Sequence, residues 1–155
     1  MNNIAIVVKQ IRNTAFDQDL IGFSQNLIKN NPLDNIAIFT TFCDTINTID
    51  VPIMHISHAC FFDADIIAFD FDSLMCATSF INKKRLIYYA QTIPWESKTY
   101  EFSYLNKVFD HSVVNSIISS SEDIAEIFHN FFQYPKIISK TLNDKIIYEN
   151  LFATI

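Results

Sequence analysis

Two histidines have a spacing that could bind a metal ion. His55 and His58 lie three residues apart, as ligands do in some metal sites. Along an extended strand, positions three apart point to opposite faces, so the two imidazoles converge only if the chain turns at Ser57. The spacing favours one packed and one exposed histidine, and we predict no metal. His58 is also a candidate general base, because the imidazole pKa lies near neutral pH.

Four aspartates bracket a short apolar run at positions 66–69. Asp63 and Asp65 precede the run, and Asp70 and Asp72 follow it. Paired carboxylates bind Mg²⁺ or act as an acid and a base. The alternative, which the sequence favours, is structural. Acidic ends keep an apolar strand soluble, and one carboxylate caps the helix that follows.

Hydroxyl and aromatic side chains in the second half of the chain offer sugar-binding chemistry. The serines at 119–121 and Glu122 precede a helical pattern, where they either bind a sugar or phosphate or simply cap the helix. Trp95, Tyr100 and Tyr104 form either a sugar-stacking platform or a cluster that packs a loop onto the core. The second interpretation is favoured. The chain contains no GxSxG motif, so we predict no serine nucleophile elbow.

The charge balance argues against a nucleic-acid partner. The 155-residue chain carries a formal net charge of −6, and an acidic surface repels phosphate backbones. Its one short basic run, residues 83–85, is interpreted as a solvated turn before a strand. Half of the residues are hydrophobic and 18% are charged, which indicates a folded chain with its own core.

Glycine, cysteine and hydropathy patterns exclude further classes of protein. The single glycine, Gly22, stands inside a helical pattern, and neither GxGxxG nor GxxxxGK[ST] occurs, so we predict no dinucleotide or other cofactor. The three cysteines are scattered and lack a CxxC pair, which favours free thiols in a reducing compartment. No apolar stretch approaches the length of a membrane span. We therefore expect no membrane partner and a soluble protein, either cytoplasmic or part of a larger particle.

Short apolar runs that alternate with helical patterns predict an α/β fold. The runs are too apolar for a sheet with one wet face, which predicts a mostly parallel sheet of six or seven strands with helices on both faces. Strands are expected at 4–8, 36–39, 53–56, 66–69, 86–89, within 113–119 and at 136–139. Helices are expected from Phe16 to the stop at Asn30-Asn31-Pro32, from a cap at Asp72 or Ser73 to Ile81, from Tyr100 to Val108, from a cap at Ser120 or Ser121 to Phe132, and over 146–151. One domain is expected to span residues 1–155.

In such a sheet, ligands bind beyond the carboxyl ends of the strands. The polar residues that follow the expected strands are therefore candidate site residues, namely Lys9, Gln10, Thr40, Thr41, Ser57, His58, Asp70, Asp72, Gln91, Thr92 and the segment Ser119 to Glu122. From this set we select His58, Gln91, Ser120 and Glu122 as ligand-binding candidates. No catalytic residue is assigned.

Several segments resemble the N-terminal domain of GT-B glycosyltransferases, which are built from two Rossmann domains. Tyr88-Tyr89-Ala90-Gln91 followed by Trp95 is similar to the family's strand that ends in an aromatic-x-Gln-Asp motif, although Thr92 replaces the Asp. Residues 118–125 resemble the family's later crossing from strand to helix near the cleft. Residues 136–139 resemble the strand that leads out of the N-terminal domain. The whole chain resembles small stand-alone glycosyltransferase-like proteins of tailed bacteriophages.

The resemblance implies a single Rossmann-like domain that binds a nucleotide-sugar or glycan, in the host cytoplasm or in a virion. The family's glycine-rich loop after the first strand is replaced here by Lys9 to Thr14. The family's second domain, which supplies most of the grip on the nucleotide-sugar, is missing. Sugar transfer therefore needs a protein partner or a second copy of the chain to complete the cleft. The alternative is a non-catalytic structural or interaction protein, for instance a component of a phage virion or assembly.

Overall fold

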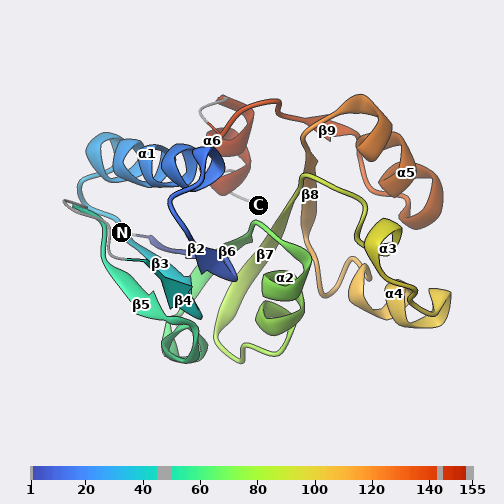
Figure 1. Cartoon of the computed structure of the whole chain (residues 1–155), viewed down its shortest axis with the longest axis horizontal. Helices are drawn as coiled ribbons and strands as arrows, with labels where there is room; N and C mark the ends of the chain where they lie inside the picture. Colours follow the sequence, from blue (N-terminus) through green and yellow to red (C-terminus); the bar gives the residue numbers. More distant parts are fainter. Residues whose placement is uncertain (1, 45–49, 143–144, 153–155) are drawn as a thin grey trace.

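A seven-stranded parallel sheet forms the centre of the molecule (Figure 1). The computed structural model describes residues 2–44, 50–142 and 145–152. The strands of the sheet are β1 (Asn3–Val7), β3 (Asn35–Thr40), β5 (Ile53–His55), β6 (Ala64–Ala68), β7 (Lys83–Ala90), β8 (Ser116–Ser119) and β9 (Ile137–Ile138). They lie in the order β5-β3-β1-β6-β7-β8-β9, and each neighbouring pair is parallel.

This strand order is that of a doubly wound Rossmann-like fold. Numbered by their place in the chain, the strands run 3-2-1-4-5-6-7, which extends the usual six-stranded order by one strand. The connecting helices are α1 (Ala15–Asn30), the 3-10 helix η1 (Ile56–Phe61), α2 (Phe71–Thr78), α3 (Pro94–Ser97), α4 (Phe102–Val108), α5 (Glu122–Phe132) and α6 (Lys145–Phe152). The predicted fold class is confirmed, and all seven expected strands are present.

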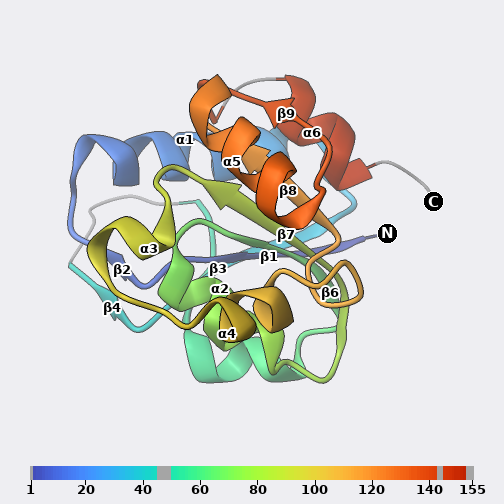
Figure 2. The ribbon, with the colours of Figure 1, turned by 90° about the vertical axis from the view of Figure 1, so that its right-hand side faces the viewer.

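Helices cover both faces of the sheet because its central strands are apolar on both sides. In β1, Ile4 and Ile6 belong to the core shared with α1 and α6, whereas Ala5 and Val7 belong to the core shared with α2, α4 and α5. All four side chains are fully buried. Figures 1 and 2 show α1 and α6 on one side of the sheet and α2 and α4 on the other. Alternate residues of a strand point to opposite faces, so burial on both sides produces the continuous apolar runs of the sequence.

Helix α1 begins at a reciprocal cap. The Thr14 hydroxyl accepts the Asp17 N–H at 3.2 Å, and the Asp17 carboxylate accepts the Thr14 N–H at 2.9 Å. Leu20 and Phe23 bury the apolar side of the helix, as their spacing predicts. Gly22 lies in the interior of this helix, and apart from its chain neighbours and the nearby backbone of the helix itself, no atom stands within 4 Å of the position that a Cβ would occupy.

Helix α2 begins earlier and ends earlier than predicted. The prediction of Asp72 or Ser73 as its cap is wrong: Asp70 is the cap, and its carboxylate accepts the Ser73 N–H at 2.8 Å. Asp70 is the cap because the chain enters α2 directly after β6, which places Asp72 inside the first turn of the helix. Phe80 and Ile81, expected on the apolar face of the helix, lie beyond its end, and Ile81 is 91% exposed.

The basic run at residues 83–85 lies in strand β7, so its interpretation as a solvated turn is wrong. Arg85 donates two hydrogen bonds to the Asp65 carboxylate on the neighbouring strand, at 2.8 and 3.0 Å. Its guanidinium also donates to the carbonyl groups of Asn150 and Leu151 at the end of α6. The side chains of Arg85 and Asp65 are only 17% and 13% exposed. The pair therefore attaches α6 to the sheet, where the carbonyl end of a helix favours a cation.

Several segments expected as connections contain short regular structure. The predicted loop from Lys9 to Thr14 includes β2 (Gln10–Ile11), which pairs in parallel with β4 (Phe42–Cys43). The turn at Ser57 is the 3-10 helix η1. Pro94, expected to break the chain, opens α3, because the first position of a helix needs no N–H. Residues 45–49 of the polar connection predicted after Thr40 lie outside the described residues.

Two properties bear on the environment of the protein. In the described ranges, no helix is both long enough and apolar enough to cross a membrane. Cys43, Cys60 and Cys76 carry free thiols.

Candidate ligand-binding site

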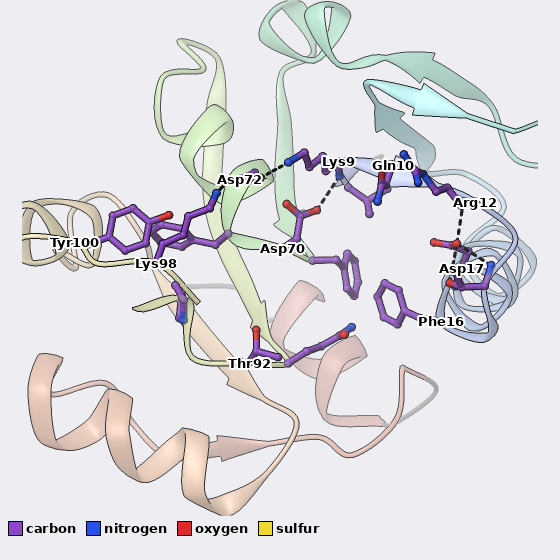
Figure 3. A pocket seen from close by; sticks show the side chains of 16 residues that line it. Lys9, Gln10, Arg12, Phe16, Asp17, Asp70, Asp72, Thr92, Lys98 and Tyr100 are labelled. Carbon is purple, nitrogen blue, oxygen red and sulfur yellow. Dashed lines mark hydrogen bonds and ion pairs between the residues drawn. The ribbon is translucent and has the colours of Figure 1, made fainter. Parts of the chain in front are cut away.

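A crevice of about 410 Å³ opens beyond the carboxyl ends of the central strands (Figure 3). Its lining comes from the segments that follow β1, β6 and β7, within residues 8–17, 69–72 and 91–100. The chain leaves β1 for α1 on one face of the sheet and leaves β6 for α2 on the other. The boundary between β1 and β6 is therefore the point where the strand order reverses, and doubly wound sheets bind their ligands at this point.

The floor of the crevice is the backbone of Lys9, which both neighbouring strands hold in place. Its N–H donates to the Asp70 carboxylate at 2.7 Å. Its carbonyl accepts the Thr41 N–H at 3.1 Å, the Thr40 hydroxyl at 3.1 Å and the Thr41 hydroxyl. These bonds connect the exits of β6, β1 and β3, so the floor is ordered without a ligand.

Lys9, Asp72 and Lys98 form a charged group at one side of the crevice (Figure 3). The Lys9 ammonium lies 2.5 Å from one Asp72 oxygen, and the Lys98 ammonium lies 3.9 Å from the other. The hydrogen bond from Lys9, helped by the charges of both lysines, lowers the pKa of Asp72 despite its partial burial. The same hydrogen bond raises the pKa of Lys9. All three side chains are substantially exposed, so water screens their interactions.

Asp17 fills the space in front of helix α1. Its carboxylate accepts the Arg12 N–H, the Thr14 N–H and the Thr14 hydroxyl at 2.7–2.9 Å, and the residue is 4% exposed. Dinucleotide-binding Rossmann domains place a pyrophosphate at the start of the helix after the first strand. Here the backbone N–H groups of that turn already bind the protein's own carboxylate.

Arg12 lies across the crevice from Lys98, as Figure 3 shows. Its guanidinium stacks over the Phe42 ring, 5.7 Å from the ring centroid. Within the described part of the chain, no carboxylate forms an ion pair with it. Arg12 thus has no ion-pair partner among the described residues, and Lys98 has only the long, exposed ion pair with Asp72 at 3.9 Å, so both side chains remain able to contact an anion.

The structure brings two of the four selected candidates, Gln91 and Ser120, together and places His58 elsewhere. Gln91 lines the crevice, and the Ser120 hydroxyl donates to the Gln91 carbonyl at 3.4 Å. Glu122 is exposed in the first turn of α5, which Ser121 caps, and His58 is exposed in η1. Five strand spacings of about 4.8 Å, or about 24 Å, separate β5 from β8 in this sheet order. His58 and Ser120 therefore belong to different parts of the sheet edge.

Most of the other residues taken from strand ends gather at the crevice. The following members of that set line it: Lys9, Gln10, Asp70, Asp72 and Thr92. Thr40 and Thr41 support it through the carbonyl of Lys9.

The two histidines lie at the start of η1 and within it. The His55 ring bonds with the Ser57 hydroxyl at 2.8 Å and caps η1. Both His55 and His58 are exposed, so the prediction of one packed imidazole is wrong. Across residues 2–44, 50–142 and 145–152, no three His, Cys, Asp or Glu side chains form a group that could hold a metal ion.

Sequence reasoning missed Arg12 and Lys98, because both lie in connections rather than directly at a strand end. A polar loop with one arginine directly after the first strand was the available signal for Arg12.

The aromatic residues considered as a stacking platform divide between two roles. Trp95 packs against the core rings of Phe109 and Phe128, which fits the structural interpretation. Tyr100 stacks on Tyr104 at 6.0 Å and also lines the crevice.

The crevice combines three kinds of recognition group. Arg12 and Lys98 offer charge to an anion. Gln10, Gln91 and Thr92 offer neutral hydrogen-bonding side chains that suit hydroxyl groups. Rings such as that of Tyr100 add an apolar wall. Such a mixture of a few polar groups and aromatic walls is typical of small-molecule sites. Comparison with protein-family models and with curated protein sequences finds no match to this chain.

Proposed function

We propose that the chain is a ligand-binding domain that takes an anionic sugar derivative, either a nucleotide-sugar or an acidic glycan, at the switch-point crevice. The observation that carries this proposal is the pair of cations on opposite walls. Arg12 lacks an acidic partner among the described residues, and Lys98 has only a contact of 3.9 Å. A phosphate or carboxylate bound at either cation gains charge-assisted hydrogen bonds.

The neutral part of the crevice suits the sugar. Gln10 and Gln91 line it, and each amide side chain both donates and accepts hydrogen bonds, as hydroxyl groups require. The Tyr100 ring supplies a flat apolar surface of the kind that stacks on a sugar ring. The resemblance of Tyr88-Tyr89-Ala90-Gln91 to the GT-B segment supports the same ligand class.

The proposed role is binding, with transfer of the sugar dependent on a partner. The crevice is open on the side away from the sheet, so a bound sugar stays in contact with water. A second wall from a protein partner or another copy of this chain would exclude that water and place an acceptor.

Thermal denaturation with a panel of ligands tests the binding proposal. The panel contains UDP-, GDP- and TDP-sugars, glucose 1-phosphate, and glucose as a neutral control. A ligand at about ten times its Kd stabilises the folded state by about 1.4 kcal/mol, which raises the Tm of a chain of this size by about 3–5 °C. We expect such a shift with at least one anionic sugar and none with glucose.

Three lysine and arginine variants locate the site. Arg12→Gln and Lys98→Gln are expected to abolish the shift, because each removes one cation of the crevice. Lys107→Gln is the matched control: Lys107 is exposed in the last turn of α4 and does not line the crevice. A shift that survives both crevice variants, or no shift with any member of the panel, refutes the proposed site.

The second candidate function is a non-catalytic interaction protein. Asp17 favours it, because its carboxylate occupies the N–H groups that a Rossmann domain ordinarily offers to phosphate. This candidate predicts an unchanged Tm across the whole panel, together with co-purification of the chain in a larger complex. The two functions thus give opposite results in the same experiment.

A further inference from the structure

A second, smaller pocket lies between α3, α4 and α5, and its lining is aromatic. Its volume is about 150 Å³, and its walls are formed by Trp95, Tyr100, Phe102, Leu105, Phe131 and Phe132. Apolar cavities of about this size bind single benzene-sized rings. We call it the aromatic pocket.

The rings of the aromatic pocket are fixed by one another. The Phe132 ring is buried, with its centroid 5.7 Å from that of Trp95 and 6.0 Å from that of Phe102. Phe102 and Phe131 meet edge to face at 6.1 Å and form the rim. These two residues are 53% and 55% exposed, although both are large and apolar. Neighbouring phenylalanines that stay half in water are typical of a binding surface.

The aromatic pocket adjoins the crevice. Tyr100 lines both of them, and in α3 the consecutive residues Pro94 and Trp95 line the crevice and the aromatic pocket, respectively. Figure 3 shows Tyr100 beside Lys98 at the edge of the crevice. A ligand bound at Lys98 therefore has an apolar recess next to it, on the other side of the Tyr100 ring.

We propose that the aromatic pocket binds an aryl group carried by the ligand of the crevice, an inference that rests on the proposed function. The ligand is then a phosphate- or carboxylate-bearing sugar with an aromatic substituent. Among the lining side chains, polar atoms come only from the Tyr100 hydroxyl and the Trp95 indole N–H. A nucleobase in this recess would leave several edge groups without partners, whereas an unsubstituted ring leaves none.

Trp95 makes the proposal directly measurable, because it is the only tryptophan of the chain. In a ¹⁵N-labelled sample, its indole N–H gives one resolvable NMR signal from the wall of the aromatic pocket. The probes are phenol, inorganic phosphate and phenyl phosphate. We expect phenol to shift the indole signal and phosphate alone to leave it in place. Phenyl phosphate is expected to bind at least about tenfold more tightly than phenol, because its two parts occupy adjoining sites.

Variants separate the two parts of the site. Phe131→Ala, at an exposed rim position, is expected to weaken binding of phenol and phenyl phosphate about fivefold and to leave phosphate binding unchanged. Phe61→Ala is the matched control, because Phe61 is 81% exposed in η1, away from both cavities. Lys98→Gln should reduce phenyl phosphate to the affinity of phenol.

The outcomes distinguish this inference from the proposed function. Anionic sugars that bind while no aryl probe moves the Trp95 signal overturn the aryl site and leave the crevice intact; the exposed rings would then contact a protein. A shift with phenol but no phosphate binding to the crevice retains the aromatic pocket and refutes the proposed function. Tighter binding of uridine monophosphate than of phenyl phosphate, with a larger shift of the indole signal, overturns the assignment of an aryl group over a nucleobase.

Discussion

Replacement of Asp70 by alanine should destabilise the protein more than replacement of any exposed aspartate. The Asp70 carboxylate accepts the Ser73 N–H at 2.8 Å, the Ser73 hydroxyl at 2.7 Å and the Lys9 N–H at 2.7 Å. Loss of a helix cap costs about 1 kcal/mol, and loss of a charge-assisted bond that leaves a backbone N–H without a partner costs about 1.5–3 kcal/mol. Because the two effects arise in one carboxylate, we expect a total of about 2–4 kcal/mol.

Urea denaturation followed by far-UV circular dichroism measures this loss against a matched variant. Asp63→Ala makes the same chemical change at the other end of β6, where the carboxylate forms only an exposed ion pair with Lys84 at 3.6 Å. Exposed pairs contribute about 0–1 kcal/mol. The unfolding free energies of Asp70→Ala and Asp63→Ala are compared. If they differ by less than about 1 kcal/mol, the Asp70 carboxylate does not connect the segment after β1 to α2.

Three further predictions concern stability and pH. Gly22→Ala should raise the free energy of unfolding by about 0.5–1 kcal/mol in urea, since the helix has room for a methyl group. Tyr134→Phe should lower it by about 1–2 kcal/mol, because the hydroxyl donates to a buried carbonyl at 2.6 Å, whereas Tyr104→Phe at the surface should change it by less than about 0.5 kcal/mol. The pKa of Asp72 is lowered in the folded protein by its hydrogen bond with Lys9. The pairing therefore stabilises the fold at a pH above the ordinary carboxyl pKa of about 3.9, and this stabilisation is lost as the pH falls through the lowered pKa of the folded state. NMR titration of the Asp72 carboxyl carbon should give a pKa below the ordinary value, and Lys9→Gln should return it toward that value; no change with Lys9→Gln would contradict the ion pair.

The fold was predictable because its signal is local. Runs such as residues 4–8 and 66–69 are apolar at every position, and only burial between two helical layers accommodates that composition. The errors arose where a distant partner decided the outcome. Because Arg85 follows two lysines, this segment resembles a polar turn in the sequence. In the structure, Arg85 donates hydrogen bonds to Asp65 on the neighbouring strand, and the segment is part of the sheet. Strands β2 and β4 consist of two residues each, which is too short for any periodicity.

The site was predictable only in part, for a geometric reason. Sequence identifies the polar residues at strand ends but not the order of the strands. All carboxyl ends share one edge of a parallel sheet, and that edge is several strands long. His58 follows β5, which lies two strands from β1, and it does not line the crevice. Lys9 and Asp70 follow the adjacent strands β1 and β6, and the Lys9 N–H donates directly to the Asp70 carboxylate. The sequence also does not decide whether Asp70 or Asp72 caps α2, because either aspartate can cap a helix.

Asp17 occupies backbone N–H groups that many Rossmann domains offer to phosphate. In a Rossmann domain with a glycine-rich loop, the backbone N–H groups before the first helix are free to bind phosphate. Here the loop from Lys9 to Thr14 contains no glycine, and its N–H groups at Arg12 and Thr14 bind the Asp17 carboxylate instead. Under the proposed function, an anionic ligand is therefore held by side chains rather than by these two N–H groups. Arg12 has no ion-pair partner among the described residues, and Lys98 has only the long ion pair with Asp72 at 3.9 Å, so these two cations on opposite walls are the side chains most available to an anion.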